Sequence, residues 1–301
     1  MKFFIDTDIG DDIDDLLTLV YALEKKLDIV GITTVYREAE KRVPIVKKIL
    51  GYKGVENIPV YAGYSKPLST EARIFGRLNY PAPDYPEATN EPDEAIAWMA
   101  ECAERYGDDL CILVLGAQTN LAHAWMRFPE RMKKVGHVAI MGGCFTLHHN
   151  EWNIAGDPTA ARIVLESEMK LSYMPWDITK DICLTDQNYE DILNLHAESL
   201  QGHLADQIRQ WKESNCHIPI LHDPATLICV LNPNMCTVRD TRMYVLDSGP
   251  ANGITLNLDT LNRFAQQPFD ARCVPRVVDV KRRDIVNEFM TVVFGITAVD
   301  A

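Results

Sequence analysis

The chain has 301 residues, of which 47% are hydrophobic and 24% are charged, and its formal net charge is -13. This composition is ordinary for a globular protein, and the length fits one large domain or two modest ones. The acidic balance disfavours nucleic acid as a partner because the phosphate backbone would be repelled, and no window is apolar enough to span a membrane.

The first half of the chain alternates strand and helix patterns. Pro44 is expected to kink or shorten its helix, Gly107 to close the next one, and Asp157 and Pro158 to start a later one. In chain order, the patterns predict strand 2–6, helix 14–26, strand 27–36, helix 38–52, strand 58–63, helix 93–107, strand 110–116, helix 118–130, strand 135–143, helix 157–167 and strand 170–176.

The second half begins with a polar, helical region at residues 180–215. Strand patterns return at residues 241–248, 253–259 and 272–280, and a terminal helix is expected from Arg283. The whole pattern predicts an α/β fold with a mostly parallel sheet flanked by helices, as one domain over residues 1–301 with helical and β additions. Ligands of such sheets bind beyond the carboxyl ends of the strands, so the functional site is expected there.

The eight cysteines are scattered and form no C-x-x-C pair. In a chain of this length they indicate reduced, buried thiols in the cytoplasm, and neither a disulfide framework nor a zinc site. The opening "MKFF" is followed at once by Asp6, so it lacks the apolar region of an export signal.

Six aspartates lie within the ten positions from Asp6 to Asp15. Asp6 and Asp8 follow the first strand, and Gly10 supplies a turn. Asp14 and Asp15 then begin a helix, which brings these carboxylates together. Clustered anions are costly unless a cation neutralises them, and Ca²⁺ and Mg²⁺ prefer carboxylate oxygens. The cluster therefore predicts a divalent cation site.

Two further interpretations of the cluster compete with a metal site. Helix capping is the favoured one for Asp11 and Asp12, but one or two carboxylates suffice for a cap. The D-x-D motif also resembles haloacid-dehalogenase phosphatases, in which Asp6 would be the nucleophile, although Ile9 and Gly10 depart from that pattern. An EF-hand is excluded because its required glycine and glutamate are absent at positions six and twelve.

The stretch "DTDIGDDIDDLLTL" resembles the opening motif of the nucleoside hydrolase family, the calcium-dependent N-ribohydrolases. The resemblance covers most of residues 3–235. It implies an α/β fold, one bound Ca²⁺, and hydrolysis of a ribonucleoside or related N-riboside to ribose and free base in purine or pyrimidine salvage. Family members are commonly homodimers or homotetramers. Further similar stretches follow in order: "GITTVY", "IPVYAGYSKPL", "LGAQTNLAHAW", "MGGCFTLHHNEWNIAGDPTAARIVL" and "LHDPATLICVL".

The resemblance also implies residue roles. Asp8 would ligate calcium and take a proton from the attacking water, while His222 either donates a proton to the leaving base or is a buried structural histidine. Further calcium ligands would be Asp15, the backbone carbonyl of Thr119, and Asp223. Implied substrate contacts are Asp14, Met141, Glu151, Asn153 and Trp152, with Asp6 and Glu38 supporting.

Several residues depart from the family pattern. Arg37 replaces a glycine beside the expected sugar site, and His148 and His149 stand in a shortened loop, where a solvated position is the favoured interpretation. A third interpretation is therefore a family member that binds nucleoside or ribose without turnover. Aromatic residues that could stack on a substrate, although core packing is favoured for each, are Trp152, Trp176, Tyr36 and Tyr64.

Overall fold

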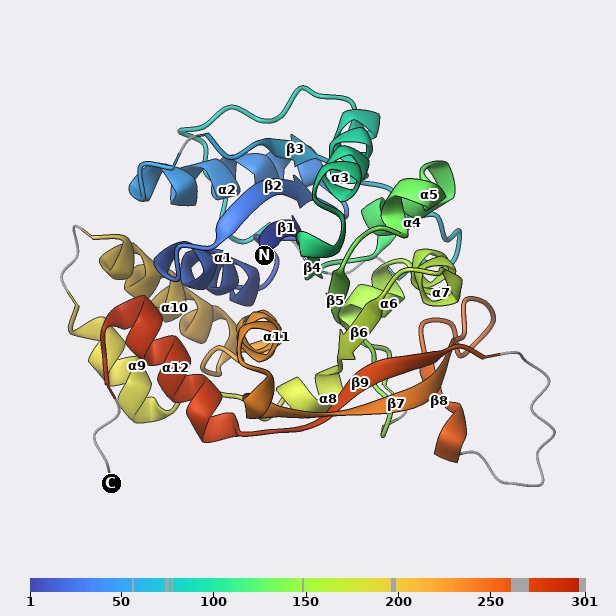
Figure 1. Ribbon diagram of the computed structural model, residues 1–301. Coiled ribbons are helices and arrows are strands. Elements are labelled where there is room, and N and C mark those ends of the chain that lie inside the picture. The colour runs from blue at the N-terminus through green and yellow to red at the C-terminus, as the bar shows by residue number, and fades with distance from the viewer. Residues whose placement is uncertain are drawn as a thin grey trace.

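A nine-stranded sheet organises the chain (Figure 1). The computed structural model describes residues 1–55, 57–73, 76, 78–147, 149–195, 199–260 and 271–297. The strand order is β3-β2-β1-β4-β5-β6-β9-β7-β8, and β7 alone runs antiparallel to its neighbours β9 and β8. The predicted mostly parallel α/β fold is confirmed. The strands are β1 (Lys2–Thr7), β2 (Asp28–Thr34), β3 (Val60–Ala62), β4 (Leu110–Val114), β5 (His137–Met141), β6 (Leu171–Met174), β7 (Cys236–Val245), β8 (Thr255–Asn257) and β9 (Cys273–Val280).

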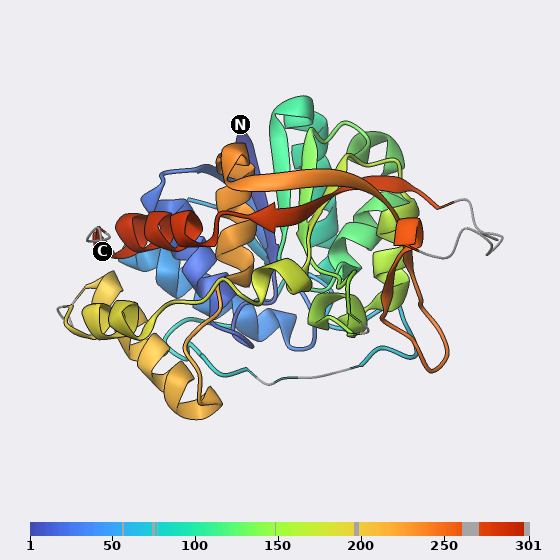
Figure 2. The same cartoon turned by 90° about the horizontal axis from the view of Figure 1, so that it is seen from below.

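Helices cover both faces of the sheet, and Figure 2 shows these layers from below. Alternate residues of β1 enter different cores, with Phe3 and Ile5 on one face and Phe4 on the other. The first core contains residues of α1, α2 and α9–α12, and the second contains residues of α3–α7. The helices are α1 (Asp14–Glu24), α2 (Ala39–Tyr52), α3 (Pro92–Tyr106), α4 (Thr119–Arg127), α5 (Pro129–Met132), α6 (Trp152–Gly156), α7 (Pro158–Glu166), α8 (Trp176–Thr179), α9 (Asp186–Leu193), α10 (Leu200–Asn215), α11 (His222–Leu231) and α12 (Arg282–Phe294), with short 3₁₀ turns at Gly107–Asp109, Pro233–Met235 and Leu258–Thr260.

Prolines act differently in two of the predicted helices. Pro44 lies inside α2 without ending it, because the Glu40 carbonyl, four residues earlier, accepts a hydrogen bond from the Ala88 amide at 3.1 Å instead. The helix predicted at 118–130 is instead two helices, since the chain leaves helical geometry at Phe128 before Pro129 begins α5. The predicted cap of α7 is confirmed.

The thiols are only partly as predicted. All eight cysteines are free, as expected for a reduced chain. The prediction that all are buried is wrong for Cys183, Cys216 and Cys273, which are exposed. Among the described residues, no helix combines the length and apolarity needed to cross a membrane.

Candidate active site

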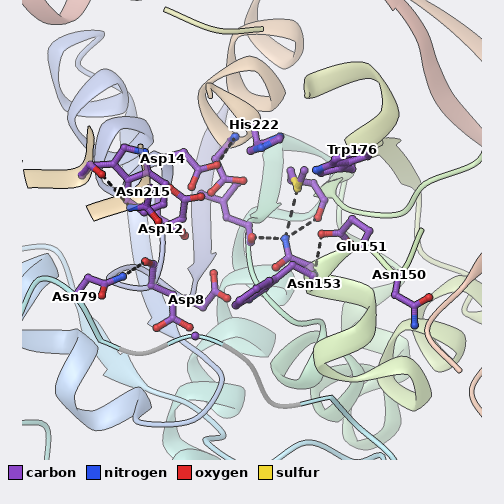
Figure 3. A pocket seen from close by; sticks show the side chains of 18 of the residues that line it. Asp8, Asp12, Asp14, Asn79, Asn150, Glu151, Asn153, Trp176, Asn215 and His222 are labelled. Carbon is purple, nitrogen blue, oxygen red and sulfur yellow. Dashed lines mark hydrogen bonds between the residues drawn. The ribbon is translucent and has the colours of Figure 1, made fainter. Parts of the chain in front are cut away.

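A cavity of about 630 Å³ opens beyond the carboxyl ends of the central strands. Asp8 reaches it from just past β1, Leu115 from just past β4, and Met141 from the end of β5. Helices α1, α6, α8, α10 and α11 and several loop residues contribute the other walls, so side chains far apart in the sequence converge there (Figure 3). This is the place that the parallel sheet predicts for a ligand.

Three buried carboxylates at the base of this cavity lie within metal-binding reach of one another. One oxygen each of Asp14, Asp15 and Asp223 lies within 4.8 Å of the others. Burial first, and then the neighbouring aspartates, raise the pKa of Asp14 and of Asp223 well above the ordinary value. Burial raises the pKa of Asp15 to about 7. The ionised forms therefore need a compensating charge.

Asp8 belongs to the same electrostatic cluster. It is 5% exposed and lines the cavity, and burial followed by the Asp15 charge raises its pKa well above the ordinary value. Within the described residues, no lysine or arginine forms an ion pair with Asp8, Asp14, Asp15 or Asp223. A hard divalent cation fits this set of oxygen donors, because it supplies the missing positive charge.

Thr119 does not line the cavity, which contradicts its predicted place beside the cation. It begins α4, and its hydroxyl donates to Asp157 Oδ2 at 2.7 Å. The nearby carbonyl that does face the cavity residues is that of Leu115, which accepts from Asn153 Nδ2 at 2.6 Å. A Cβ on the adjacent Gly116 would lie 3.0 Å from Asp8 Cβ, so this backbone packs against Asp8.

Glu151 and Asn153 both line the cavity, but not as alternating residues of an extended segment. Glu151 is the N-cap of α6, and its carboxylate accepts from the Asn153 and Ile154 amides at 2.8 and 3.0 Å. The side-chain nitrogen of Asn153, Nδ2, donates to the carbonyls of Leu115 and Met141, as the dashed lines in Figure 3 show. The cap and these two bonds fix both side chains at the cavity wall.

His222 reaches the cavity from the first residue of α11. Burial lowers its pKa to about 4, so the imidazole is neutral near pH 7. Its Nδ1 lies 2.6 Å from the Thr179 hydroxyl. A neutral ring with one nitrogen held by a hydroxyl can offer the other nitrogen to a ligand as a hydrogen-bonding group.

Two residues with predicted supporting roles lie outside the cavity. Asp6 is fully buried, where its Oδ1 accepts from Thr33 and Asn120 at 2.6 and 2.8 Å, and burial raises its pKa to about 7. Asp6 therefore braces strands but cannot reach a phosphate ester, which contradicts the phosphatase interpretation. Glu38 precedes α2 and pairs with Lys41 at 2.6 Å without lining the cavity, and its supporting role stays a prediction.

The loop between β1 and α1 carries two aspartates for which helix capping was the favoured interpretation. Asp11 pairs with the fully buried Arg42 at 3.0 Å, and both Asp11 and Asp12 line the cavity. Burial raises the pKa of Asp12 to about 6.

Aromatic side chains also line the cavity. Trp152 is 41% exposed there, so core packing is wrong for it. Trp176 lines the cavity and also packs against the first core, and it stacks on His149 with ring centroids 4.3 Å apart. His149 is exposed, as predicted for a solvated position, and it also lines the cavity. His148 lies outside the described residues. Tyr36 is buried and Tyr64 stacks on His123, both outside the cavity lining.

The comparisons with known proteins agree with this geometry. The sequence model of the family described as inosine-uridine preferring nucleoside hydrolase matches residues 3–287. The chain is 30% identical to probable uridine nucleosidase 1 of Oryza sativa subsp. japonica over 279 residues, which cover 85% of this chain and 84% of that one. A solved plant nucleoside hydrolase superposes with a TM-score of 0.82 at 25% identity, covering 97% of this chain and 98% of that one. A purine-preferring ribonucleoside hydrolase from Gardnerella vaginalis superposes with a TM-score of 0.77 at 26% identity, covering 98% of each chain.

Proposed function

The chain belongs to the inosine-uridine preferring nucleoside hydrolase family and is an N-glycosyl hydrolase, and we propose that it hydrolyses a ribonucleoside or related N-riboside to ribose and free base with one Ca²⁺ in the cavity. The observation that carries this proposal is the set of buried carboxylates of Asp14, Asp15 and Asp223, without a lysine or arginine partner among the described residues, beside Glu151 and Asn153. Relatives named as nucleosidases favour turnover over the non-catalytic interpretation, and ribose release is the measurement that separates the two.

Asp8, Asp15 and Asp223, with the carbonyl of Leu115 in place of that of Thr119, are the proposed protein ligands. When bound, the cation supplies Lewis acidity and neutralises the clustered carboxylates. Asp8 is proposed to accept a proton from the attacking water, because its carboxylate lines the cavity just past β1 and the family resemblance implies this role.

The sugar is held by residues on the cavity wall. Asp14, Glu151 and Asn153 are proposed to bind ribose hydroxyls, and Met141 lies beside the ring. Cleavage of an N-glycosidic bond develops positive charge on the sugar, as in glycoside hydrolysis, and the surrounding carboxylates stabilise this charge.

The leaving base is proposed to meet His222. Since the imidazole is neutral near pH 7, it acts as a hydrogen-bonding group rather than as an imidazolium acid. Trp152 is proposed as an aromatic surface for the substrate. The named relatives include uridine and purine nucleoside hydrolases, so the base is left open. We also propose that the protein acts in purine or pyrimidine salvage in the cytoplasm and that it assembles as a homodimer or homotetramer.

The test is a reducing-sugar assay over a panel of purine and pyrimidine nucleosides. Protein stripped of metal by a chelator is assayed before and after titration with Ca²⁺ or Mg²⁺, with p-nitrophenyl phosphate as the control substrate. We expect ribose release from at least one nucleoside, loss of release on chelation, and recovery with Ca²⁺ in preference to Mg²⁺. Phosphate release without ribose release, or ribose release that is insensitive to chelation, would contradict the proposal.

A further inference from the structure

Arg42 is a fully buried arginine beneath the cavity. It lies in the first turn of α2, and none of its side chain is exposed. Burying a guanidinium group is costly unless its charge is paired and its N–H groups are hydrogen-bonded. The partners of Arg42 therefore identify the parts of the chain that the buried guanidinium group holds in place.

The guanidinium group binds two loops at once. Its Nε donates to the Tyr36 carbonyl at 3.0 Å, after β2. Its Nη1 donates to the carbonyls of Asp8 and Ile9, the latter at 3.0 Å, and its Nη2 donates to Asp11 Oδ1 at 3.0 Å. The planar fork thus links the loop that carries Asp8 to the loop after the neighbouring strand.

Other features of the two loops are consistent with such a clamp. Tyr36 and Arg37 have φ angles of 70° and 52°, which are unfavourable for residues with a Cβ atom and persist where surrounding contacts impose them. On the opposite side of the Asp8 loop, the Gly10 carbonyl accepts from the Asn79 amide at 2.7 Å. The loop is therefore held from two directions.

We propose that Arg42 is a positioning residue of the active site, which fixes the backbone of residues 8–11 so that the Asp8 carboxylate enters the cavity. This inference rests on the role proposed for Asp8. The Asp8 carbonyl is bound directly by the guanidinium group, so loss of Arg42 frees the peptide that orients the Asp8 side chain.

A purely structural ion pair explains less of the arrangement. Within the part of the chain that the structure describes, the buried Oδ2 of Asp11 has no hydrogen-bond partner, and Asp11 itself lines the cavity. Arg42 thus holds the backbone of the loop that carries Asp8 by hydrogen bonds, and it neutralises Asp11 in the same loop.

The experiment compares the full-length chains carrying Arg42→Met and Arg42→Lys with Ile49→Ala. Ile49 lies two turns further along α2 and is 1% exposed in the core, so its truncation destabilises the same helix without touching the loop of Asp8. Each chain is measured for Ca²⁺ affinity by calorimetry, for amide exchange of a peptide spanning residues 8–13, and for kcat and KM of ribose release.

We expect Arg42→Met to weaken Ca²⁺ binding by at least about tenfold and to lower kcat more than it raises KM, since a misplacement of about 1 Å can cost about 10²-fold. Its 8–13 peptide should exchange faster than that of Ile49→Ala, and Arg42→Lys should recover part of the loss because it keeps the charge but not the fork.

Two outcomes separate this inference from the proposed function. The positioning role would be overturned if Arg42→Met had the same Ca²⁺ affinity, amide exchange and kcat as Ile49→Ala. If the native chain released no ribose from any nucleoside, the proposed function would fail, while Ca²⁺ affinity and exchange would still decide the role of Arg42. If Arg42→Met did not fold, Arg42→Lys would decide it by the same three readouts.

Discussion

Asp157 should be among the most sensitive positions for stability in this chain. It is fully buried, and its carboxylate accepts four hydrogen bonds from three separate segments. Its Oδ1 accepts from the amides of Ser69 and Ala160, both at 3.1 Å. Its Oδ2 accepts from the Leu68 amide and the Thr119 hydroxyl, both at 2.7 Å. One side chain therefore caps α7 and ties it to α4 and to the segment around residue 68.

Asp157→Ala removes all four acceptors at once. A buried donor left without a partner costs about 1–3 kcal/mol, and the lower end of that range for four donors gives about 4 kcal/mol. Thr185→Ala is the matched control, because Thr185 caps α9 through a single exposed capping box. Loss of a cap alone costs about 1 kcal/mol.

The measurement is urea unfolding of the two variants and the native chain, in buffer with chelator so that metal does not contribute. We expect Asp157→Ala to lower the free energy of unfolding by about 3 kcal/mol more than Thr185→Ala, with similar m-values. Equal losses in the two variants would refute the reasoning that Asp157 joins three segments.

Three further predictions concern the cavity. Gly116→Ala should lower Ca²⁺ affinity and kcat, because the new Cβ would lie 3.0 Å from Asp8 Cβ and 2.8 Å from Val35 Cγ1; unchanged calorimetry and kinetics would contradict this packing. Ca²⁺ affinity should rise as the pH is raised through about 7, the pKa of buried Asp15, since protons compete with the cation below it; affinity that is constant with pH would oppose this. Asp6→Asn should retain ribose release, because Asn keeps the acceptor for Thr33 and Asn120; complete loss would restore a chemical role for Asp6.

The alternation of strand and helix patterns was sufficient to predict a mostly parallel sheet between layers of helices. Residues of β1 enter both cores, so a short run buried on both faces indicates a central parallel strand. Element ends were less predictable because they depend on distant partners. Pro44 stays within α2 since the amide of Ala88, far along the chain, binds the carbonyl that the proline leaves free.

The carboxylates of the site were predictable because charge at the end of a buried strand is costly unless it is paired or binds a cation. Asp15 and Asp223, more than 200 positions apart, meet within 4.8 Å, and the ordered motifs anticipated that they would. Backbone contributions were not predictable in the same way. A carbonyl has no residue type of its own, so the sequence carried no signal for the carbonyl of Leu115 that we propose as a ligand, and the family resemblance assigned that of Thr119 instead.

The partners of buried charges were also beyond the sequence. Arg42 looks like one of several cations in an amphipathic helix, and only the fold shows that it enters the protein to meet Asp11. The aromatic contacts that line the cavity were likewise not predictable from the sequence. Stacking of His149 on Trp176 depends on the path of the loop after β5, which the apolar pattern does not determine.

The most direct test of the central claim is kcat for ribose release by Asp8→Asn at saturating Ca²⁺ and nucleoside. Asn preserves the shape and one ligand oxygen but accepts a proton poorly, and a general base contributes about 10²–10⁴-fold. We predict a loss of kcat of about 10² or more with Ca²⁺ still bound. Ribose release at the native rate, with native Ca²⁺ content, would contradict the account.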